Sequence, residues 1–213
     1  MKLNLGCGHN FLEGYVNVDC MDIYDPDVVH NLEHFPWPWE DDSVDEIVLT
    51  HTLEHLGADT QTYFNVWKEI YRVLKNNSTA TITVPHWLHE NFAHDPTHVR
   101  KVTPIGVAMF DQERNVSDFS NNGKETKLGL LLGIDFRIEN FGYGLSQEVK
   151  DAIKAGKITN EDVFRMVNTA PNICEEIYII VQAIKPARNS INILQKTLAK
   201  NTKIIDECSF TVE

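Results

Sequence analysis

Hydrophobic and polar residues alternate over several short stretches of this chain, and one longer stretch follows the period of a helix. Alternation and runs of β-branched residues predict strands at residues 2–5, 15–18, 44–49, 79–84, 136–143 and 176–184, with a weaker candidate at 28–32. Apolar residues at helical spacing over 62–74 predict the clearest helix, which we expect Asn76 and Asn77 to end. Strands that alternate with helices are typical of an α/β sheet with parallel strands.

The chain becomes less regular after residue 85. We expect mainly irregular structure over 86–122, a helical turn at 107–110, and two helices between the late strands, at 146–155 and 160–167. This spacing predicts one domain over 1–186 with insertions at about 86–122 and 145–172, followed by a C-terminal helix or tail over 187–213. Because a long insertion joins the late strands, we expect an antiparallel edge strand in a mostly parallel sheet.

The first two predicted strands are separated by only about nine residues, which is short for a parallel crossover that contains a full helix. Two interpretations are open. Either the crossover helix is reduced to a turn, or the first strand pairs differently.

The chain has 213 residues and a formal net charge of −12. A protein this acidic has no general attraction for a phosphate backbone, so nucleic acid is not the expected partner. No apolar run approaches the roughly 20 residues that span a bilayer, so we expect no membrane partner. The first residues lack a signal-peptide pattern and the four cysteines form no CxxC pair, which predicts a cytoplasmic protein with reduced thiols.

A Gly-Cys-Gly turn directly follows the first predicted strand, and Asp19 ends the second. A glycine turn lets the backbone approach a ligand without a Cβ in the way, and an acid at the next strand end can accept hydrogen bonds from both ribose hydroxyls. The alternative is a tight turn with no ligand. Phe11 stands where a dinucleotide fingerprint has its third glycine, which argues against a dinucleotide site.

Four segments, in this order, resemble class I S-adenosylmethionine-dependent methyltransferases, and most closely the compact, methyltransferase type 11-like branch. They are LNLGCGHNFLEGYVNVD, FPWPWEDDSVDEIVLTHTLEHL, WKEIYRVLKNNSTATITVP and EIYIIVQAIK. The resemblance implies a Rossmann-like α/β three-layer sandwich, S-adenosylmethionine as cofactor, and transfer of its methyl group to an acceptor.

The resemblance also implies which residues hold the cofactor. The glycine turn would carry its methionine end, Asp19 its ribose hydroxyls and residues 31–32 its adenine, while His51 would line the cleft. The implied cofactor-binding residues are Leu5, Gly6, Cys7, Gly8, Asp19, Asn31, Leu32 and His51.

Three asparagines depart from the family pattern. Asn4 and Asn31 stand where many members have an acid, and Asn10 stands where many have a third glycine. The family's LEH signature is present, with Glu54 and His55 at the start of a helix-like stretch. For these two residues structural support and a direct catalytic role are both open.

The stretch PHWLHENFAHDPTHVRKVTP, residues 85–104, is rich in histidine and follows a predicted strand. Ligands bind outside the carboxyl ends of the strands in open α/β sheets, so this stretch should border the cleft. It is interpretable as a substrate lid with a histidine base, as a metal site, or as a turn whose histidines bond the backbone. We favour the lid, whose predicted catalytic residues are His86, His89, His94, Asp95 and His98.

No metal ligand is assigned, because Pro96 interrupts any helix that would put His94 and His98 on one face. Trp87 and Arg100 are the predicted substrate-binding residues, as an apolar wall and as a cation for a carboxylate or phosphate. For both, a purely structural role is the alternative.

These observations predict a methyltransferase that acts on an acceptor of unknown identity, with a small molecule preferred. The alternatives are a metal-dependent enzyme that uses the histidine cluster on the same scaffold, and a non-catalytic methyltransferase-like binding module. The sequence identifies neither the acceptor nor the pathway, and it leaves a homo-oligomer open.

Overall fold

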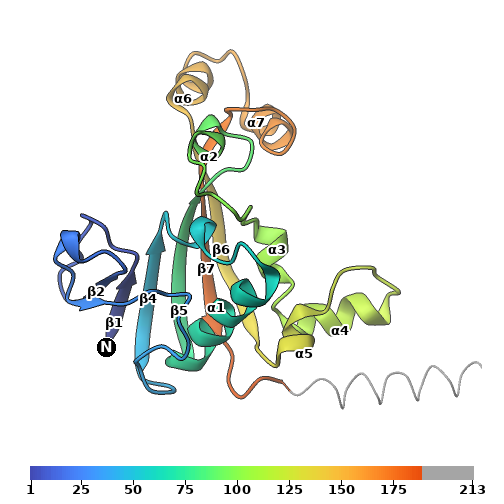
Figure 1. Cartoon of the computed structure of the whole chain (residues 1–213). Helices are drawn as coiled ribbons and strands as arrows, with labels where there is room; N and C mark the ends of the chain where they lie inside the picture. The colour runs from blue at the N-terminus through green and yellow to red at the C-terminus, as the bar shows by residue number, and fades with distance from the viewer. Residues whose placement is uncertain (189–213) are drawn as a thin grey trace, which may run out of the picture.

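The computed structural model of this protein describes residues 1–188. Seven strands form one sheet in the order β3-β2-β1-β4-β5-β7-β6, with helices packed beside it (Figure 1). The strands are β1 (Lys2–Leu5), β2 (Val16–Asp19), β3 (Val28–Val29), β4 (Val44–Thr50), β5 (Leu74–Pro85), β6 (Phe136–Leu145) and β7 (Cys174–Ala183). The α-helices are α1 (Thr60–Val73), α2 (Glu90–His94), α3 (Pro104–Ala108), α4 (Gln112–Ser120), α5 (Leu128–Leu132), α6 (Gln147–Lys154) and α7 (Asn160–Met166). Two short 3-10 turns are η1 (Asp22–Tyr24) and η2 (Leu53–His55).

The strands β1 to β5 pair in parallel, and β7 runs antiparallel to both of its neighbours, β5 and β6. The predicted fold class, a mostly parallel Rossmann-like sheet with an antiparallel strand, is therefore confirmed. The reversed strand lies one position in from the edge, since β6 forms the edge itself. The C-terminal helix predicted beyond residue 188 lies outside the described residues.

The crossover between β1 and β2 is a turn. The two strands pair in parallel, with Leu3 beside Val16, although only residues 6–15 join them. The interpretation in which the first helix is reduced to a turn is thus the correct one of the two.

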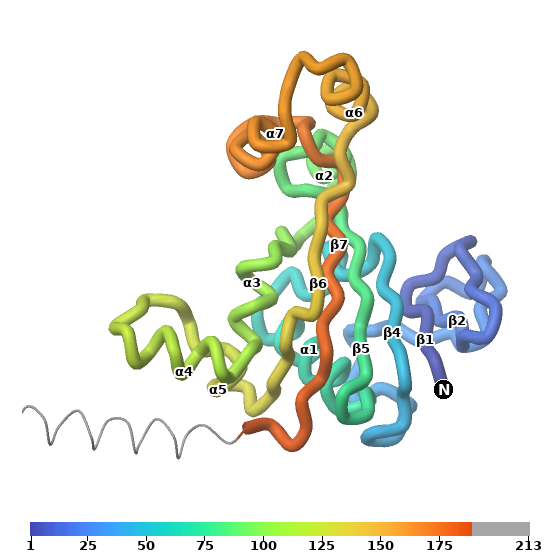
Figure 2. The backbone as a smooth tube through the Cα atoms, turned by 180° about the vertical axis from the view of Figure 1, so that it is seen from behind, coloured from blue at the N-terminus to red at the C-terminus, as the bar shows by residue number. Residues whose placement is uncertain are grey.

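Alternate residues of the central strands point to opposite faces of the sheet, and those on one face are fully buried. Leu5 and Leu49 lie in one core with Trp67 and Ile70 of α1. The indole of Trp67 stacks on Phe110 at 4.5 Å between ring centroids. Seen from behind, the strands lie in front of α1 and α3, so these two helices pack on the face turned away in that view (Figure 2).

The predicted end of the long helix is wrong. The helix ends at Val73 rather than at Asn76 and Asn77, because Leu74 is fully buried and already pairs with Val44 in the sheet. Strand pairing outweighs the local helical pattern there.

The segment predicted to be irregular, 86–122, contains the helices α2, α3 and α4. Their starts follow local rules: Thr103 caps α3 by accepting from the N–H of Gly106, and Asp111 caps α4 by accepting from Glu113 and Arg114. The helix α4 escapes a hydrophobicity-based prediction because most of its residues are polar.

The two predicted insertions meet above the carboxyl ends of the strands. There α2 lies with α6 and α7 at the top of the molecule (Figures 1 and 2). The N–H of Glu90 donates to Oδ1 of Asn172 at 2.9 Å, and the N–H of Asn172 donates to the carbonyl of Leu88 at 3.2 Å. In the described part of the chain, no helix is long and apolar enough to cross a membrane.

Candidate functional site

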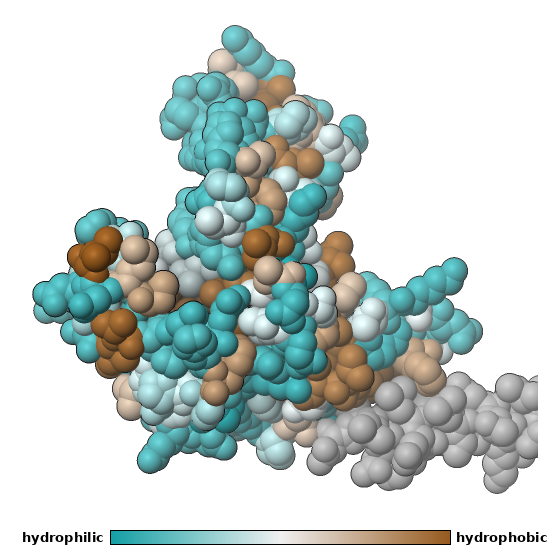
Figure 3. Space-filling view, viewed as in Figure 1, coloured by the Kyte–Doolittle hydropathy of each residue, from teal (hydrophilic) through white to brown (hydrophobic). Residues whose placement is uncertain are grey.

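A cavity of 560 Å³ opens at the carboxyl ends of β1, β2 and β4. This volume is in the range of small-molecule sites. In the space-filling view the surface is hollowed between the part formed by β1–β3 and the part that rises above the sheet (Figure 3). The cavity is lined by Gly6, Gly8, Asp19, Cys20, Met21, Tyr24, His30, Asn31, Leu32, His51, Thr52, His55, Leu56 and Thr97.

The glycine turn needs its glycines for geometric reasons. Gly6 has a φ of +69°, and a Cβ there would meet the hydroxyl of Thr52 at 2.4 Å. That hydroxyl is itself fixed, because it donates to the carbonyl of Leu5 at 3.0 Å. Gly8 also has a positive φ, +49°, but no atom lies within 4 Å of the place for its Cβ. The turn therefore packs tightly at its first glycine and is open at its second.

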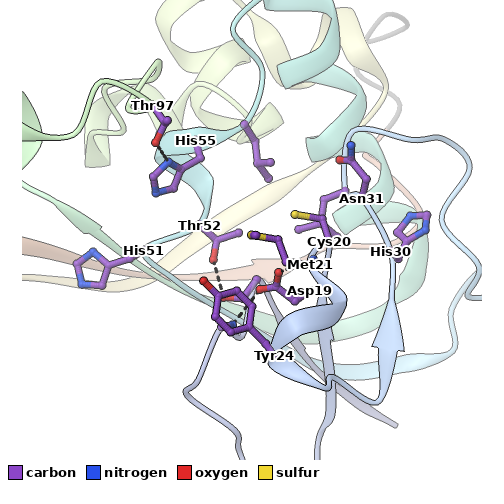
Figure 4. A pocket seen from close by; sticks show the side chains of 14 residues that line it. Asp19, Cys20, Met21, Tyr24, His30, Asn31, His51, Thr52, His55 and Thr97 are labelled. Atoms are coloured by element: carbon purple, nitrogen blue, oxygen red, sulfur yellow. Dashed lines mark hydrogen bonds between the residues drawn. The ribbon is translucent and has the colours of Figure 1, made fainter.

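Asp19 is held against this turn. Its Oδ2 accepts from the N–H of Gly8 and its Oδ1 from the N–H of Met21, each at 2.9 Å. Each carboxylate oxygen keeps a further lone pair for a ligand. The carboxylate therefore stands at the centre of the cavity wall with its orientation already set (Figure 4).

One end of the cavity is formed by residues 30–32. Asn31 accepts from the N–H of Glu33 through Oδ1 at 2.9 Å, which leaves its Nδ2 group as a donor for a ligand. The buried side chain of Leu32 gives this end an apolar floor. An amide donor beside an apolar floor suits a heteroaromatic base.

The other end is formed by His51, Thr52, His55, Leu56 and Thr97. His51 follows β4 with a φ of +51°, a conformation that L-residues rarely adopt outside functional or strained positions. Its Nε2 lies 2.9 Å from Oε1 of Glu176, and its Nδ1 lies 3.5 Å from Oε1 of Glu54. The two carboxylates, Glu54 foremost, raise the pKa of His51 above its usual value although burial opposes them.

His55 and Thr97 meet at this end through a hydrogen bond of 2.9 Å, drawn in Figure 4. The Thr97 hydroxyl donates to Oδ1 of Asp95, so it accepts from Nδ1 of His55. This arrangement leaves Nε2 of His55 without its proton in the neutral ring.

The structure brings most of the predicted cofactor-binding residues to the cavity. Gly6, Gly8, Asp19, Asn31, Leu32 and His51 line it, whereas Leu5 is fully buried beneath the turn and Cys7 is almost so. Burial and the nearby Asp19 raise the pKa of the Cys7 thiol, which keeps it protonated.

The predicted catalytic residues separate into two groups. Asp95 and His98 lie beside the end of the cavity that His51, His55 and Thr97 form, within reach of Thr97 and Glu54. His86 is buried below Trp87, His89 caps α2 by accepting from the N–H of Asn91, and His94 is exposed at the end of α2. These three do not line the cavity.

The two predicted substrate-binding residues also lie outside the lining. Trp87 stacks on His86 with ring centroids 3.9 Å apart. The guanidinium of Arg100 lies 4.5 Å over the Tyr63 ring and donates to the carbonyl of Gly57. Arg100 thereby fastens the histidine-rich segment to α1.

Several lining residues had no role assigned from sequence, among them Thr52 and Thr97. Both are polar residues next to predicted features, Thr52 beside the LEH signature and Thr97 inside the HDPTH stretch. Their position next to these features is the sequence signal from which both threonines could have been predicted to line the site.

Comparison with known proteins agrees with this geometry. Residues 3–82 match a family model described as a methyltransferase domain. The structure resembles that of a SAM-dependent methyltransferase from Archaeoglobus fulgidus, with 22% identity, a TM-score of 0.56 and coverage of 85% of each chain. It also resembles that of a possible histamine N-methyltransferase from Thermotoga maritima, with 12% identity, a TM-score of 0.50, and coverage of 86% of this chain and 81% of that one. No curated protein matches the sequence.

At such identities the structural likeness shows the fold alone, whereas the family model matches the strands and turns that build the cavity. Residues 3–82 are therefore similar to a methyltransferase domain, and the chain has the fold of solved S-adenosylmethionine-dependent methyltransferases.

Proposed function

We propose that the cavity binds S-adenosylmethionine and that the protein transfers its methyl group to a small-molecule acceptor. The observation that carries this proposal is the hydrogen bond from the N–H of Gly8 to Asp19, which holds the carboxylate against the glycine turn. In this arrangement Asp19 accepts from the ribose hydroxyls, the open backbone at Gly8 faces the methionine end, and Asn31 with Leu32 holds the adenine.

Bound S-adenosylmethionine supplies a methyl group that its sulfonium already activates. The protein therefore contributes mainly by positioning the acceptor in line with that group. We propose that His51, His55 and Thr97 face the acceptor, since they form the end of the cavity opposite residues 30–32. Asp95 and His98 lie behind these residues. Asp95 fixes Thr97 by accepting a hydrogen bond from its hydroxyl, and Nε2 of His98 lies 4.0 Å from Oε1 of Glu54.

The small-molecule acceptor is inferred from charge and shape. The chain carries a formal net charge of −12, and carboxylates at Glu54, Asp95 and Glu176 surround the acceptor end. A polyanionic acceptor would be repelled there, whereas a neutral or cationic small molecule would not.

Substitution of Asp19 tests cofactor binding. We expect Asp19→Ala to weaken S-adenosylmethionine binding by about 100-fold, because two hydrogen bonds to a carboxylate of about 1.5 kcal/mol each are lost. Asp19→Asn should lose most of the affinity while it keeps an acceptor for the glycine turn. Titration calorimetry with S-adenosylmethionine and its demethylated product measures both.

The matched control is Asp22→Ala, which removes the same charge from the exposed turn η1 next to the cavity. Its affinity should equal that of the unmodified protein. Absence of heat with either ligand in the unmodified protein, or equal affinities for the Asp19 and Asp22 variants, would refute the proposal.

A further inference from the structure

Glu54 is a buried carboxylate that has no hydrogen-bond partner among residues 1–188. Its side chain is 0% exposed, and neither carboxylate oxygen makes a hydrogen bond with a described residue. Two histidine nitrogens lie within ion-pair distance of Oε1, Nδ1 of His51 at 3.5 Å and Nε2 of His98 at 4.0 Å. An ionised carboxylate buried in such a position is stable only with a cation beside it.

Two histidines beside this carboxylate direct a lone pair into the same space. Nδ1 of His98 lies 3.0 Å from the carbonyl of Phe92, an acceptor, so this nitrogen carries the proton and Nε2 is free in the neutral ring. Nδ1 of His55 donates to Thr97, whose own proton goes to Asp95, so Nε2 of His55 is free as well. Metal-binding histidines are oriented in this way, by a carbonyl or a carboxylate on the other ring nitrogen.

The backbone holds the three side chains together. The carbonyl of Glu54 accepts from the N–H of Val99 at 2.9 Å and from the N–H of Arg100 at 3.0 Å, which folds the histidine-rich segment back over η2. As a result one ligand atom from each of Glu54, His55 and His98 lies within 4.8 Å of the others. Ligand atoms of a tetrahedral zinc ion are roughly 3.3 Å apart, so small side-chain rotations would close the set on an ion.

We propose that Glu54, His55 and His98 form a binding site for a divalent transition-metal ion at the acceptor end of the cavity. Two imidazoles and one carboxylate suit zinc, iron(II) or manganese, and three protein ligands leave coordination positions open. Because His55 and Thr97 line the cavity, an open position faces the space assigned to the acceptor. The site differs from the one considered from sequence, since only His98 comes from the histidine-rich segment.

Metal retention by the untagged chain tests the proposal. The protein is stripped with a chelator, equilibrated with zinc chloride, passed over a desalting column and analysed for zinc per chain. We expect the unmodified protein to retain one equivalent, and Glu54→Gln and His98→Asn to bind zinc about 100-fold more weakly, since loss of even an outer-shell partner weakens metal sites by about 10–100-fold. Cobalt(II) in place of zinc should give the visible absorption of a four-coordinate ion in the unmodified protein but not in the Glu54 and His98 variants.

His94→Asn is the matched control, because it removes an exposed histidine from the same segment without touching the cluster. It should retain zinc like the unmodified protein. Zinc should also raise the melting temperature of the unmodified and His94 proteins but not that of the Glu54 variant, which separates a lost site from a misfolded chain.

The proposal is overturned if the unmodified protein fails to retain zinc, or if the Glu54 and His98 variants retain as much zinc as the unmodified protein. His51 would then be the group that balances the charge of Glu54. The proposal is independent of methyl transfer, since its test measures the zinc bound per chain and not an enzymatic activity. Calorimetry with S-adenosylmethionine on the stripped protein shows separately whether cofactor binding stands.

Discussion

His86 shows how surroundings change the chemistry of a side chain. It is 1% exposed and stacks on Trp87, and its Nδ1 accepts from the N–H of Leu88 at 3.2 Å. Its Nε2 is buried and has no hydrogen-bond partner in the part of the chain that the structure describes. Burial lowers the pKa of His86 to about 4. The ring is therefore neutral at physiological pH and packs as a flat, uncharged side chain against Trp87 of the histidine-rich segment.

This depressed pKa predicts a pH-dependent stability. A histidine in the unfolded chain takes up a proton below about pH 6.5, whereas folded His86 does so only near pH 4, so protons favour the unfolded chain between these values. We expect acidification from pH 7 to pH 5 to remove about 2 kcal/mol of unfolding free energy through His86. Urea denaturation should show a smaller loss over this range in His86→Gln than in the unmodified protein.

The exposed His94 provides the comparison, because His94→Gln should lose stability with pH as the unmodified protein does. Parallel pH profiles for the His86 variant and the unmodified protein would show that His86 is not the titrating group.

At the scale of elements, the helix-free crossover between β1 and β2 is held by side-chain amides. Oδ1 of Asn17 accepts from Nδ2 of Asn4 at 2.9 Å and from the N–H of Leu12 at 2.8 Å. Nδ2 of Asn17 donates to Oδ2 of Asp27 at 3.0 Å, and Nδ2 of Asn4 also donates to the carbonyl of Asn10 at 2.8 Å. These bonds satisfy backbone groups that a crossover helix would otherwise satisfy internally. The departures Asn4 and Asn10 are thus parts of one network.

Removal of the central amide should loosen the crossover. We expect Asn17→Ala to cost about 2–4 kcal/mol of unfolding free energy, because the N–H of Leu12 and the amide of Asn4 lose their buried acceptor. Urea denaturation measures the loss, and faster hydrogen exchange at Leu12 locates it. Asn10→Ala, which keeps the backbone carbonyl and removes only an exposed side chain, should change stability little. Similar losses in both variants would contradict the network.

At the scale of the whole molecule, the end of the described chain is fastened to two distant segments. The guanidinium of Arg188 donates to both carboxylate oxygens of Asp135, which precedes β6, and to Oδ1 of Asp111, which caps α4. Asp135 is 0% exposed and also accepts from the N–H of Gln112. One cation thus joins the chain after β7, the start of β6 and the start of α4.

Loss of this cation should destabilise the whole fold. Arg188→Met leaves a buried carboxylate without its partner, for which we expect a loss of about 3–5 kcal/mol of unfolding free energy. Arg165→Met breaks the exposed ion pair with Glu161 on α7 and should cost at most about 1 kcal/mol. Thermal and urea denaturation compare them, and the added change Asp135→Asn should restore part of the loss. A loss for Arg188→Met no larger than for Arg165→Met would refute the anchoring role.

The sequence by itself determined most of the sheet and which residues line one end of the cavity. Alternating and β-branched residues predicted six strands close to their observed bounds, because a pleated, half-buried surface imposes a period of two on the sequence. Asp19 was predicted beside the glycine turn because β1 and β2 are parallel neighbours whose carboxyl ends meet at one edge. Both are consequences of local pattern and of chain order.

Only the tertiary structure decided which residues gather at the other end of the cavity. Glu54, His55 and His98 meet because the segment after α2 folds back onto the carbonyl of Glu54, which accepts from Val99, 45 positions further along the chain. His86, from the same histidine-rich stretch, is instead buried under Trp87. No period or propensity distinguishes one histidine from the next in that stretch. Their roles depend on long-range hydrogen bonds and burial, which a single sequence does not record.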